Sequence, residues 1–210
     1  MKIAFLAPAG AMHRFNGSFG KSLHYAPLTL TTLAALIPES LNAEAKIYDE
    51  TIEKIPLDLE ADIIVMTSIT GTSQRCYAYA DYFRQRGITV VLGGVHPSLM
   101  PEEVQEYADT VFVGSAEGNW EKFLIELENG HPQKVYEEIK LPDISEVVYD
   151  RSLFKDKKYS FVVPVQFGRG CMHQCEFCTI GSVHKGDYAH RKVELVIEEI
   201  KEIFRTNKRA

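Results

Sequence analysis

The chain has 210 residues, of which 45% are hydrophobic and 25% charged, with a formal net charge of −6. This is an ordinary globular composition, which argues against disordered, collagen-like and coiled-coil chains. The longest apolar runs, such as residues 63–66, are far shorter than the ~20 residues that a membrane-spanning helix needs. Residues 1–5 lack the apolar core and cleavage site of a signal peptide, so we expect a cytoplasmic protein without a membrane span.

Charge is unevenly distributed along the chain. Residues 1–140 carry a net charge of −8, whereas residues 141–210 carry +2. This shift indicates a boundary near residue 140. The acidic first part argues against a nucleic-acid surface, because binding to phosphates requires clustered Lys and Arg.

Strand-like and helix-like segments alternate through the first 130 residues. Short apolar runs predict strands at residues 2–7, 45–48, 62–67, 89–92 and 110–113, and periodic apolar residues predict helices at 27–37, 72–86, 101–107 and 119–128. The alternation predicts an α/β fold with a parallel sheet covered by helices on both faces. Cys76 falls on the apolar face of its helix and is expected in the core.

The remainder of the chain begins less regularly. Pro132, Pro142 and scattered charges indicate a linker, followed by a strand at residues 161–167 and a cysteine-rich loop. A strongly amphipathic helix follows from residue 193. Its apolar face comprises Val193, Val196, Ile197, Ile200, Ile203 and Phe204.

Loops after the predicted strands carry the candidate ligand-binding residues, because ligands bind parallel sheets at the carboxyl ends of strands. Hydroxyl groups supply hydrogen bonds, and glycines permit close backbone approach, which suits a nucleotide-like tail. His96 either contacts a ligand or caps its turn, and Glu117 either binds a ligand or caps the helix that follows. The candidates are Ser68, Thr70, Gly93, Gly94, His96, Gly114 and Glu117.

Three cysteines crowd into eight residues as Cys171-x3-Cys175-x2-Cys178. In a chain without secretory features this spacing favours metal binding over a disulfide. Three thiolates can hold one side of a [4Fe–4S] cluster and leave one iron open for a substrate-like group. Zinc is the alternative, with His173 or His184 completing a tetrahedral site.

With Phe177 before the last cysteine, and with a strand before and a helix after, the loop resembles the signature of radical S-adenosylmethionine (SAM) enzymes. The resemblance implies that Cys171, Cys175 and Cys178 bind a [4Fe–4S] cluster and that SAM chelates its open iron. It places Phe177 near the adenine of SAM. It also implies an external electron donor such as flavodoxin or ferredoxin, since SAM cleavage consumes one electron.

The first part resembles the Rossmann-like cobalamin-binding domain that precedes the radical domain in one large subgroup. The matching residues are Ser68-x-Thr70, then 22 residues, then Gly93-Gly94, then the segment from Gly114 to Gly118. The implied organisation is a cobalamin-binding domain at residues 1–135, a linker at 136–160 and the first βα unit of a radical SAM partial (β/α) barrel at 161–210.

The implied function is that of the amino-terminal part of a cobalamin-dependent radical SAM enzyme. Such an enzyme performs methyl transfer or other radical chemistry on an unactivated centre of a small-molecule substrate. A complete eight-unit barrel takes ~250 residues, so we expect this chain to lack turnover by itself. The alternative is a non-catalytic Rossmann-like ligand- or cobalamin-binding module with a zinc- or cluster-bound tail.

Overall fold

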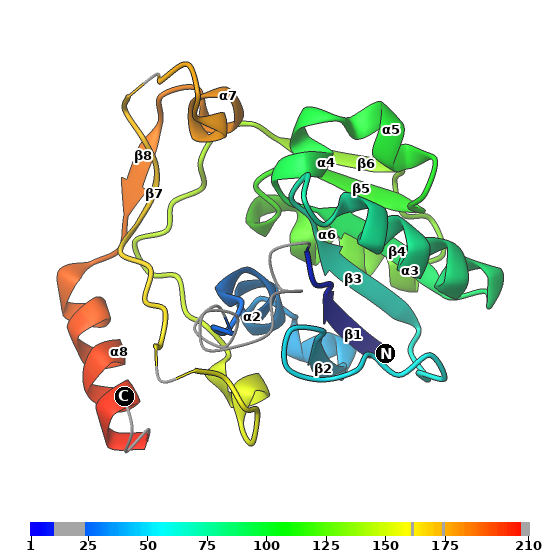
Figure 1. Cartoon of the computed structure of the whole chain (residues 1–210), viewed down its shortest axis with the longest axis horizontal. Coiled ribbons are helices and arrows are strands. Elements are labelled where there is room, and N and C mark those ends of the chain that lie inside the picture. Colours follow the sequence, from blue (N-terminus) through cyan, green and yellow to red (C-terminus); the bar gives the residue numbers. More distant parts are fainter. Residues whose placement is uncertain (11–23, 161, 174, 207–210) are drawn as a thin grey trace.

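The computed structural model describes residues 1–10, 24–160, 162–173 and 175–206. Six parallel strands form one sheet in the order β2-β1-β3-β4-β5-β6 (Figure 1). The predicted α/β fold with a parallel sheet is therefore confirmed. The strands are β1 (Lys2–Ala7), β2 (Glu44–Asp49), β3 (Ile63–Thr67), β4 (Thr89–Gly93), β5 (Thr110–Gly114) and β6 (Val135–Glu138).

Helices cover both faces of the sheet because successive strand residues point to opposite sides. Ile63 and Val65 of β3 join the cluster formed with α2 and α6, whereas Ile64 and Met66 join the cluster formed with α3 and α5. Burial on both faces explains why this strand is a continuous apolar run. The helices of this domain are α2 (Leu28–Ala35), α3 (Ser73–Gln85), α4 (Val95–Leu99), α5 (Pro101–Gln105) and α6 (Glu117–Glu128), with a 3₁₀ helix, η2 (Glu39–Leu41).

Cys76 is fully buried on α3, as its place on the apolar face predicts. Burial raises the pKa of its thiol to about 11, so this cysteine stays protonated at neutral pH. It is therefore a core residue, distinct from the three cysteines of the later loop.

The sequence analysis does not predict η2 or two further elements of this domain, α4 and β6. The helix α4 begins directly after the Gly-Gly turn, and β6 pairs with β5, with Gly114 opposite Glu138. Only Tyr136 of β6 is buried, so this strand lacks the apolar run that marks the others. The predicted linker thus includes a strand of the sheet, and the predicted boundary at residue 135 falls on its first residue.

The tail differs from the predicted strand at residues 161–167. Residue 161 lies outside the described residues, and 162–167 have no strand or helix assignment. The strand here is β7 (Gly168–Gly170), which pairs antiparallel with β8 (Tyr188–His190). Pro164 lacks the N–H that strand pairing needs, which explains why the apolar run is not a paired strand. The tail comprises this antiparallel pair, α7 (Thr179–His184) and α8 (Val193–Thr206), and α8 is the amphipathic helix predicted from residue 193.

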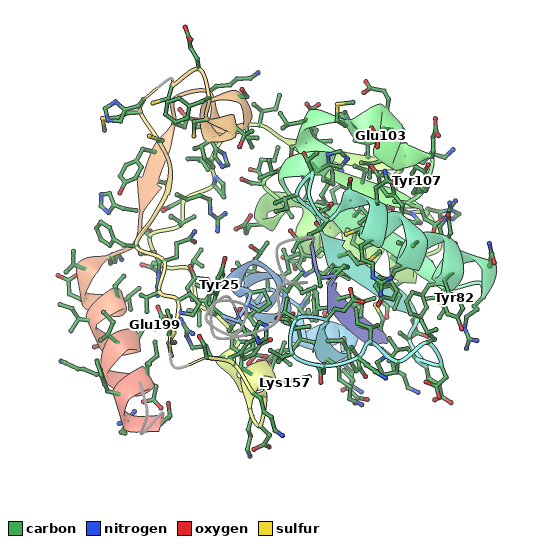
Figure 2. All side chains as sticks on the ribbon, viewed as in Figure 1. Tyr25, Tyr82, Glu103, Tyr107, Lys157 and Glu199 are labelled. Atoms are coloured by element: carbon green, nitrogen blue, oxygen red, sulfur yellow. The ribbon has the colours of Figure 1, made fainter. Side chains whose placement is uncertain are left out.

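An ionic cluster fixes α8 to the preceding segment, which includes the 3₁₀ helix η3 (Arg151–Phe154). The Glu199 carboxylate accepts hydrogen bonds from Arg151 and from Arg191, which is 3% exposed. Arg191 also donates to the Gln166 carbonyl at 3.2 Å, and its guanidinium lies 5.0 Å from the centre of the Tyr149 ring. Figure 2 labels Glu199 on α8. One carboxylate thus pairs with the buried Arg191 and the half-buried Arg151, while Arg191 Nε has no hydrogen-bond partner among the described residues.

The apolar face of α8 is only partly covered. Val196 and Ile203 are buried, whereas the other four predicted face residues are exposed. Figure 1 shows α8 standing at the edge of the molecule, separated from the sheet by the linker. The exposed members of the face are Val193, Ile197, Ile200 and Phe204. Within the described part of the chain, no helix has the length and apolarity needed to traverse a bilayer.

Candidate functional site

A cavity opens at the carboxyl ends of β3, β4 and β5, on the side of the sheet covered by α2 and α6. It encloses about 950 Å³, including its open mouth. The sheet domain supplies most of the wall, and the tail closes one side through Gln166, Arg169, Val183 and His184. This is the edge at which open parallel sheets bind ligands.

The cavity is largely apolar, and one residue of its wall has an unpaired donor. Trp120, on α6, lines it and is fully buried, and its indole Nε1–H has no hydrogen-bond partner among the described residues. An unpaired buried donor is costly unless an acceptor meets it. A flat, mostly apolar ligand group with an accepting atom therefore fits this wall.

Glycines allow the strand ends to approach the cavity closely. Gly94 has a φ of +106°, and a Cβ there would lie 2.7 Å from Thr67 Oγ1. The Gly114 amide donates to Ser98 Oγ at 2.8 Å, and that hydroxyl donates to the Gly94 carbonyl at 2.7 Å. The two glycine turns are thus tied together, and Gly93, Gly94 and Gly114 all line the cavity.

Three other predicted residues lie beside the cavity rather than in its wall. The Ser68 hydroxyl is buried and donates to the Ile69 carbonyl at 3.2 Å. Thr70 is exposed on the same loop. The His96 ring is buried on the α3 and α5 side, with Nε2 2.8 Å from the Tyr77 hydroxyl and Nδ1 3.3 Å from Thr70 Oγ1. In this structure these side chains support the turns that shape the cavity.

Glu117 begins α6 and faces the tail across the cavity. Its carboxylate pairs with Arg169, and the two side chains are 14% and 18% exposed. A carboxylate is stabilised at a helix amino terminus, so Glu117 serves both the helix and the ion pair. Arg169 also donates to Gln166 Oε1 at 3.3 Å, and that atom accepts from the Tyr149 hydroxyl at 2.9 Å.

Sequence reasoning missed several wall residues, chiefly Trp120, Arg169 and His184. Burial, with the nearby Arg169 charge, lowers the pKa of His184, so this ring is neutral at physiological pH. The sequence offered one usable signal, because Trp120 lies three residues after Glu117 on the same helix face. The positions of Arg169 and His184 depend on how the tail packs.

The three clustered cysteines follow Arg169 on one loop and are free thiols. Cys175 is exposed and the other two are half-buried. The His173 amide donates to Cys171 Sγ at 3.4 Å. Among the described residues, no three His, Cys, Asp or Glu side chains lie close enough together to hold a metal ion. The donor set, three thiols on one glycine-flanked loop, nevertheless suits an iron–sulfur cluster in chemistry.

Phe177, within the same loop, is 91% exposed. Gly170 has a φ of +80°, and a Cβ there would lie 2.2 Å from the Asp187 carbonyl oxygen. The backbone on the amino-terminal side of Cys171 therefore passes close to the segment preceding β8. The roles of the cysteines and of Phe177 remain predictions.

Comparison with protein families decides what the sheet domain is. The family model described as the B12 binding domain matches residues 24–124, which run from before α2 into α6 and include most of the cavity wall. The chain contains a B12-binding domain. The resemblance of the first part of the chain to a cobalamin-binding domain is thus confirmed.

Two curated relatives from Chlorobaculum tepidum carry the same similarity beyond the B12-binding domain. Bacteriochlorophyllide d C-8(2)-methyltransferase is 33% identical over 189 residues, covering 84% of this chain and 41% of the relative. Bacteriochlorophyllide d C-12(1)-methyltransferase is 28% identical over 181 residues, covering 83% and 40%. The chain therefore spans about two fifths of the length of these relatives.

A solved structure has the same fold. The radical S-adenosylmethionine methyltransferase TsrM from Kitasatospora setae superposes with a TM-score of 0.67 at 13% identity, covering 96% of this chain and 45% of TsrM. The coverage includes the tail as well as the B12-binding domain. At this identity the likeness establishes the fold alone.

Proposed function

We propose that this chain is the cofactor-binding, amino-terminal part of a cobalamin-dependent radical SAM methyltransferase that acts on a small-molecule substrate. One observation carries the proposal: the cavity of the B12-binding domain shares its wall with the segment that leads into the cysteine loop. The similarity to two methyltransferases across both parts supports it.

The residues divide into two sets. Gly93, Gly94, Gly114 and Trp120 line the space that would take cobalamin, with Trp120 Nε1–H offering a donor. Cys171, Cys175 and Cys178 would hold a [4Fe–4S] cluster, with Phe177 toward SAM. When bound, these groups supply methyl-carrier and one-electron chemistry. The protein binds and orients them, and a flavodoxin- or ferredoxin-like donor would supply the electron.

Intrinsic fluorescence tests the cobalamin assignment directly, because Trp120 is the only tryptophan in the chain and lines the cavity. Titration with hydroxocobalamin should quench its emission saturably, beyond the inner-filter loss measured with free N-acetyltryptophanamide. Quenching no greater than that of the free indole would overturn the assignment.

Anaerobic reconstitution with iron and sulfide tests the cluster independently. We expect about four iron atoms per chain. Cys171→Ala, Cys175→Ala and Cys178→Ala should each lose the cluster, whereas Cys76→Ala, at the buried core cysteine, should retain it. Stoichiometric zinc without iron after anaerobic purification would instead favour a non-catalytic module with a zinc-bound tail.

A further inference from the structure

Four side chains form a continuous hydrogen-bonded series beneath the Gly-Gly turn. The Tyr77 hydroxyl lies 2.9 Å from Glu103 Oε1 and 2.8 Å from His96 Nε2. The other ring nitrogen of His96 lies 3.3 Å from Thr70 Oγ1. The series therefore connects α5, through α3 and the start of α4, to the loop after β3.

The series has a direction because its ends differ in chemistry. An ionised carboxylate only accepts hydrogen bonds, so the Tyr77 hydroxyl donates a hydrogen bond to Glu103. The Tyr77 oxygen then accepts from Nε2–H of His96. A neutral imidazole carries one ring proton, so Nδ1 is left as an acceptor and accepts a hydrogen bond from the Thr70 hydroxyl. The two lone pairs of the Thr70 hydroxyl can then only accept hydrogen bonds.

The surrounding packing holds this arrangement in place. The Tyr77 ring stacks on Tyr107 with centroids 4.0 Å apart and planes within 6°. The side chain of His96 is 6% exposed, and its Nε2 lies 3.7 Å from Glu103, beyond hydrogen-bond range, so the contact runs through Tyr77. Figure 2 labels Glu103 and Tyr107 in the region of α5. Thr70 is exposed at the sheet edge that bears the cavity.

We propose that His96 is a positioning residue that fixes Thr70 as a hydrogen-bond acceptor toward the bound ligand. The matching ligand group is a donor, such as a primary amide N–H of the kind that the corrin ring of cobalamin carries at its rim. The inference rests on the proposed cobalamin site. It assigns to His96 an indirect role, through Thr70, in place of the direct contact that its position in the turn suggested.

The protonation pattern is measurable without any cofactor. ¹⁵N NMR of histidine-labelled protein at pH about 8, above the ordinary histidine pKa of about 6.5, should show His96 as the Nε2–H form. Tyr77→Phe removes the acceptor of that proton and should move the ring toward the Nδ1–H form. Tyr107→Phe, which alters the stacked neighbour, should leave it unchanged. An Nδ1–H or doubly protonated ring in the unmodified protein would reverse the polarity of Thr70 and overturn the proposal.

Cobalamin affinity tests the consequence. Thr70→Val should weaken binding of hydroxocobalamin about tenfold, a loss typical of one hydrogen bond, and Thr70→Ser should restore it. Tyr77→Phe should weaken binding similarly, and the double variant Tyr77→Phe/Thr70→Val should bind no more weakly than Thr70→Val. Additive losses would show that Tyr77 acts independently of Thr70. Binding by the unmodified protein with no effect of Thr70→Val overturns this inference alone, whereas no binding by the unmodified protein overturns the proposed function.

Discussion

Individual glycines at the cavity are required by contact as well as by backbone angle. Gly114 has a φ of +79°, and a Cβ there would lie 2.1 Å from the Glu138 carbonyl oxygen. Gly130 has the same φ of +79°, but its Cβ would meet nothing within 4 Å. Comparing Gly114 with Gly130 therefore separates the free-energy cost of a left-handed backbone from the cost of a steric clash.

Gly114→Ala should therefore destabilise the chain more than Gly130→Ala. The left-handed conformation alone should lower the free energy of unfolding by about 1 kcal/mol in Gly130→Ala. The clash with β6 should bring the loss in Gly114→Ala to roughly 3 kcal/mol or more. Urea denaturation measures both, and equal losses would contradict the close approach of β5 and β6.

Ionisation of the Glu50 carboxyl makes the stability of the fold depend on pH. Burial alone would raise the pKa of its carboxyl, but hydrogen bonds from Arg75, Tyr79 and the Ala9 amide together lower it from the ordinary 4.5. Because the folded-state pKa is depressed, the ionised carboxylate stabilises the fold above pH 4.5. That contribution is lost as the pH falls through the folded-state value.

Glu50→Gln should consequently flatten the acid side of the stability profile. The unmodified chain should lose stability more steeply below pH 4.5 than the variant does, as measured by urea midpoints across that range. Glu60→Gln is the control, since this carboxylate pairs with Lys2 but is 86% exposed. A variant with an unchanged acid slope would show that the Glu50 contacts do not persist in solution.

Sequence reasoning identified the glycines and the cysteines because each residue type has a specific chemical use. Glycine is needed wherever backbones approach closely, and thiols at short spacing favour metals. Trp120 and Arg169 have many uses, so only the packed structure reveals that both line the cavity. The network around His96 was equally inaccessible, since Tyr77 and Glu103 lie on two other helices, α3 and α5.

At the scale of elements, the contact between α6 and β7 decides how the tail is held. Glu117 begins α6, Arg169 is the central residue of β7, and their ion pair is largely shielded from solvent. A shielded pair is expensive to break from one side, because the remaining charge lacks a partner. The tail should therefore loosen when either partner is removed.

Glu117→Gln should raise the rate of amide hydrogen exchange in β7 and β8 about tenfold. The substitution removes the charge that pairs with Arg169 but keeps the size of the side chain, so the tail should open locally more often. Amides of the central strands β3 and β4 should be unaffected. Glu202→Gln is the matched control, since it breaks the exposed pair with Arg205. Equal exchange in both variants would mean that the ion pair does not hold the tail.

Elements with strong periodicity or long apolar runs were predictable, as was the short helix α5, whereas α4 and β6 were not. The strands β1, β3, β4 and β5 and the helix α3 lie within two residues of their expected bounds. By contrast, β6 is a four-residue edge strand with alternating burial, and α4 has five residues. The antiparallel pairing of β7 with β8 depends on long-range contacts, such as the Gly168 backbone against the Tyr188 ring, that local sequence does not encode.

At the scale of the whole molecule, the apolar face of α8 forms an exposed hydrophobic patch. Val193, Ile197, Ile200 and Phe204 expose between 37% and 63% of their surface along one helix. Contiguous apolar patches of this kind favour association or aggregation. The isolated chain should consequently self-associate as its concentration rises.

Ile197→Lys/Phe204→Lys should reduce that self-association without destabilising the fold, because both side chains are exposed. Sedimentation velocity over a range of concentrations measures the effect. Glu198→Lys, elsewhere on the helix, makes a comparable change in charge and should leave association largely unchanged. Identical concentration dependence for all three proteins would show that this face is not responsible.

The B12-binding domain and the tail share the wall of the cavity, so ligand binding and attachment of the tail are linked equilibria. A ligand that contacts both Gly94 and Arg169, which line the same cavity, binds only while the tail is in place. Saturation then favours attachment by RT ln(1 + [L]/Kd), about 2.7 kcal/mol at a hundredfold excess over Kd. Because Cys171 lies two residues after Arg169, loading of the cavity would restrict the motion of the cysteine loop. A filled first domain would thereby stabilise the segment that carries the thiols, and the attached segment would in turn strengthen ligand binding.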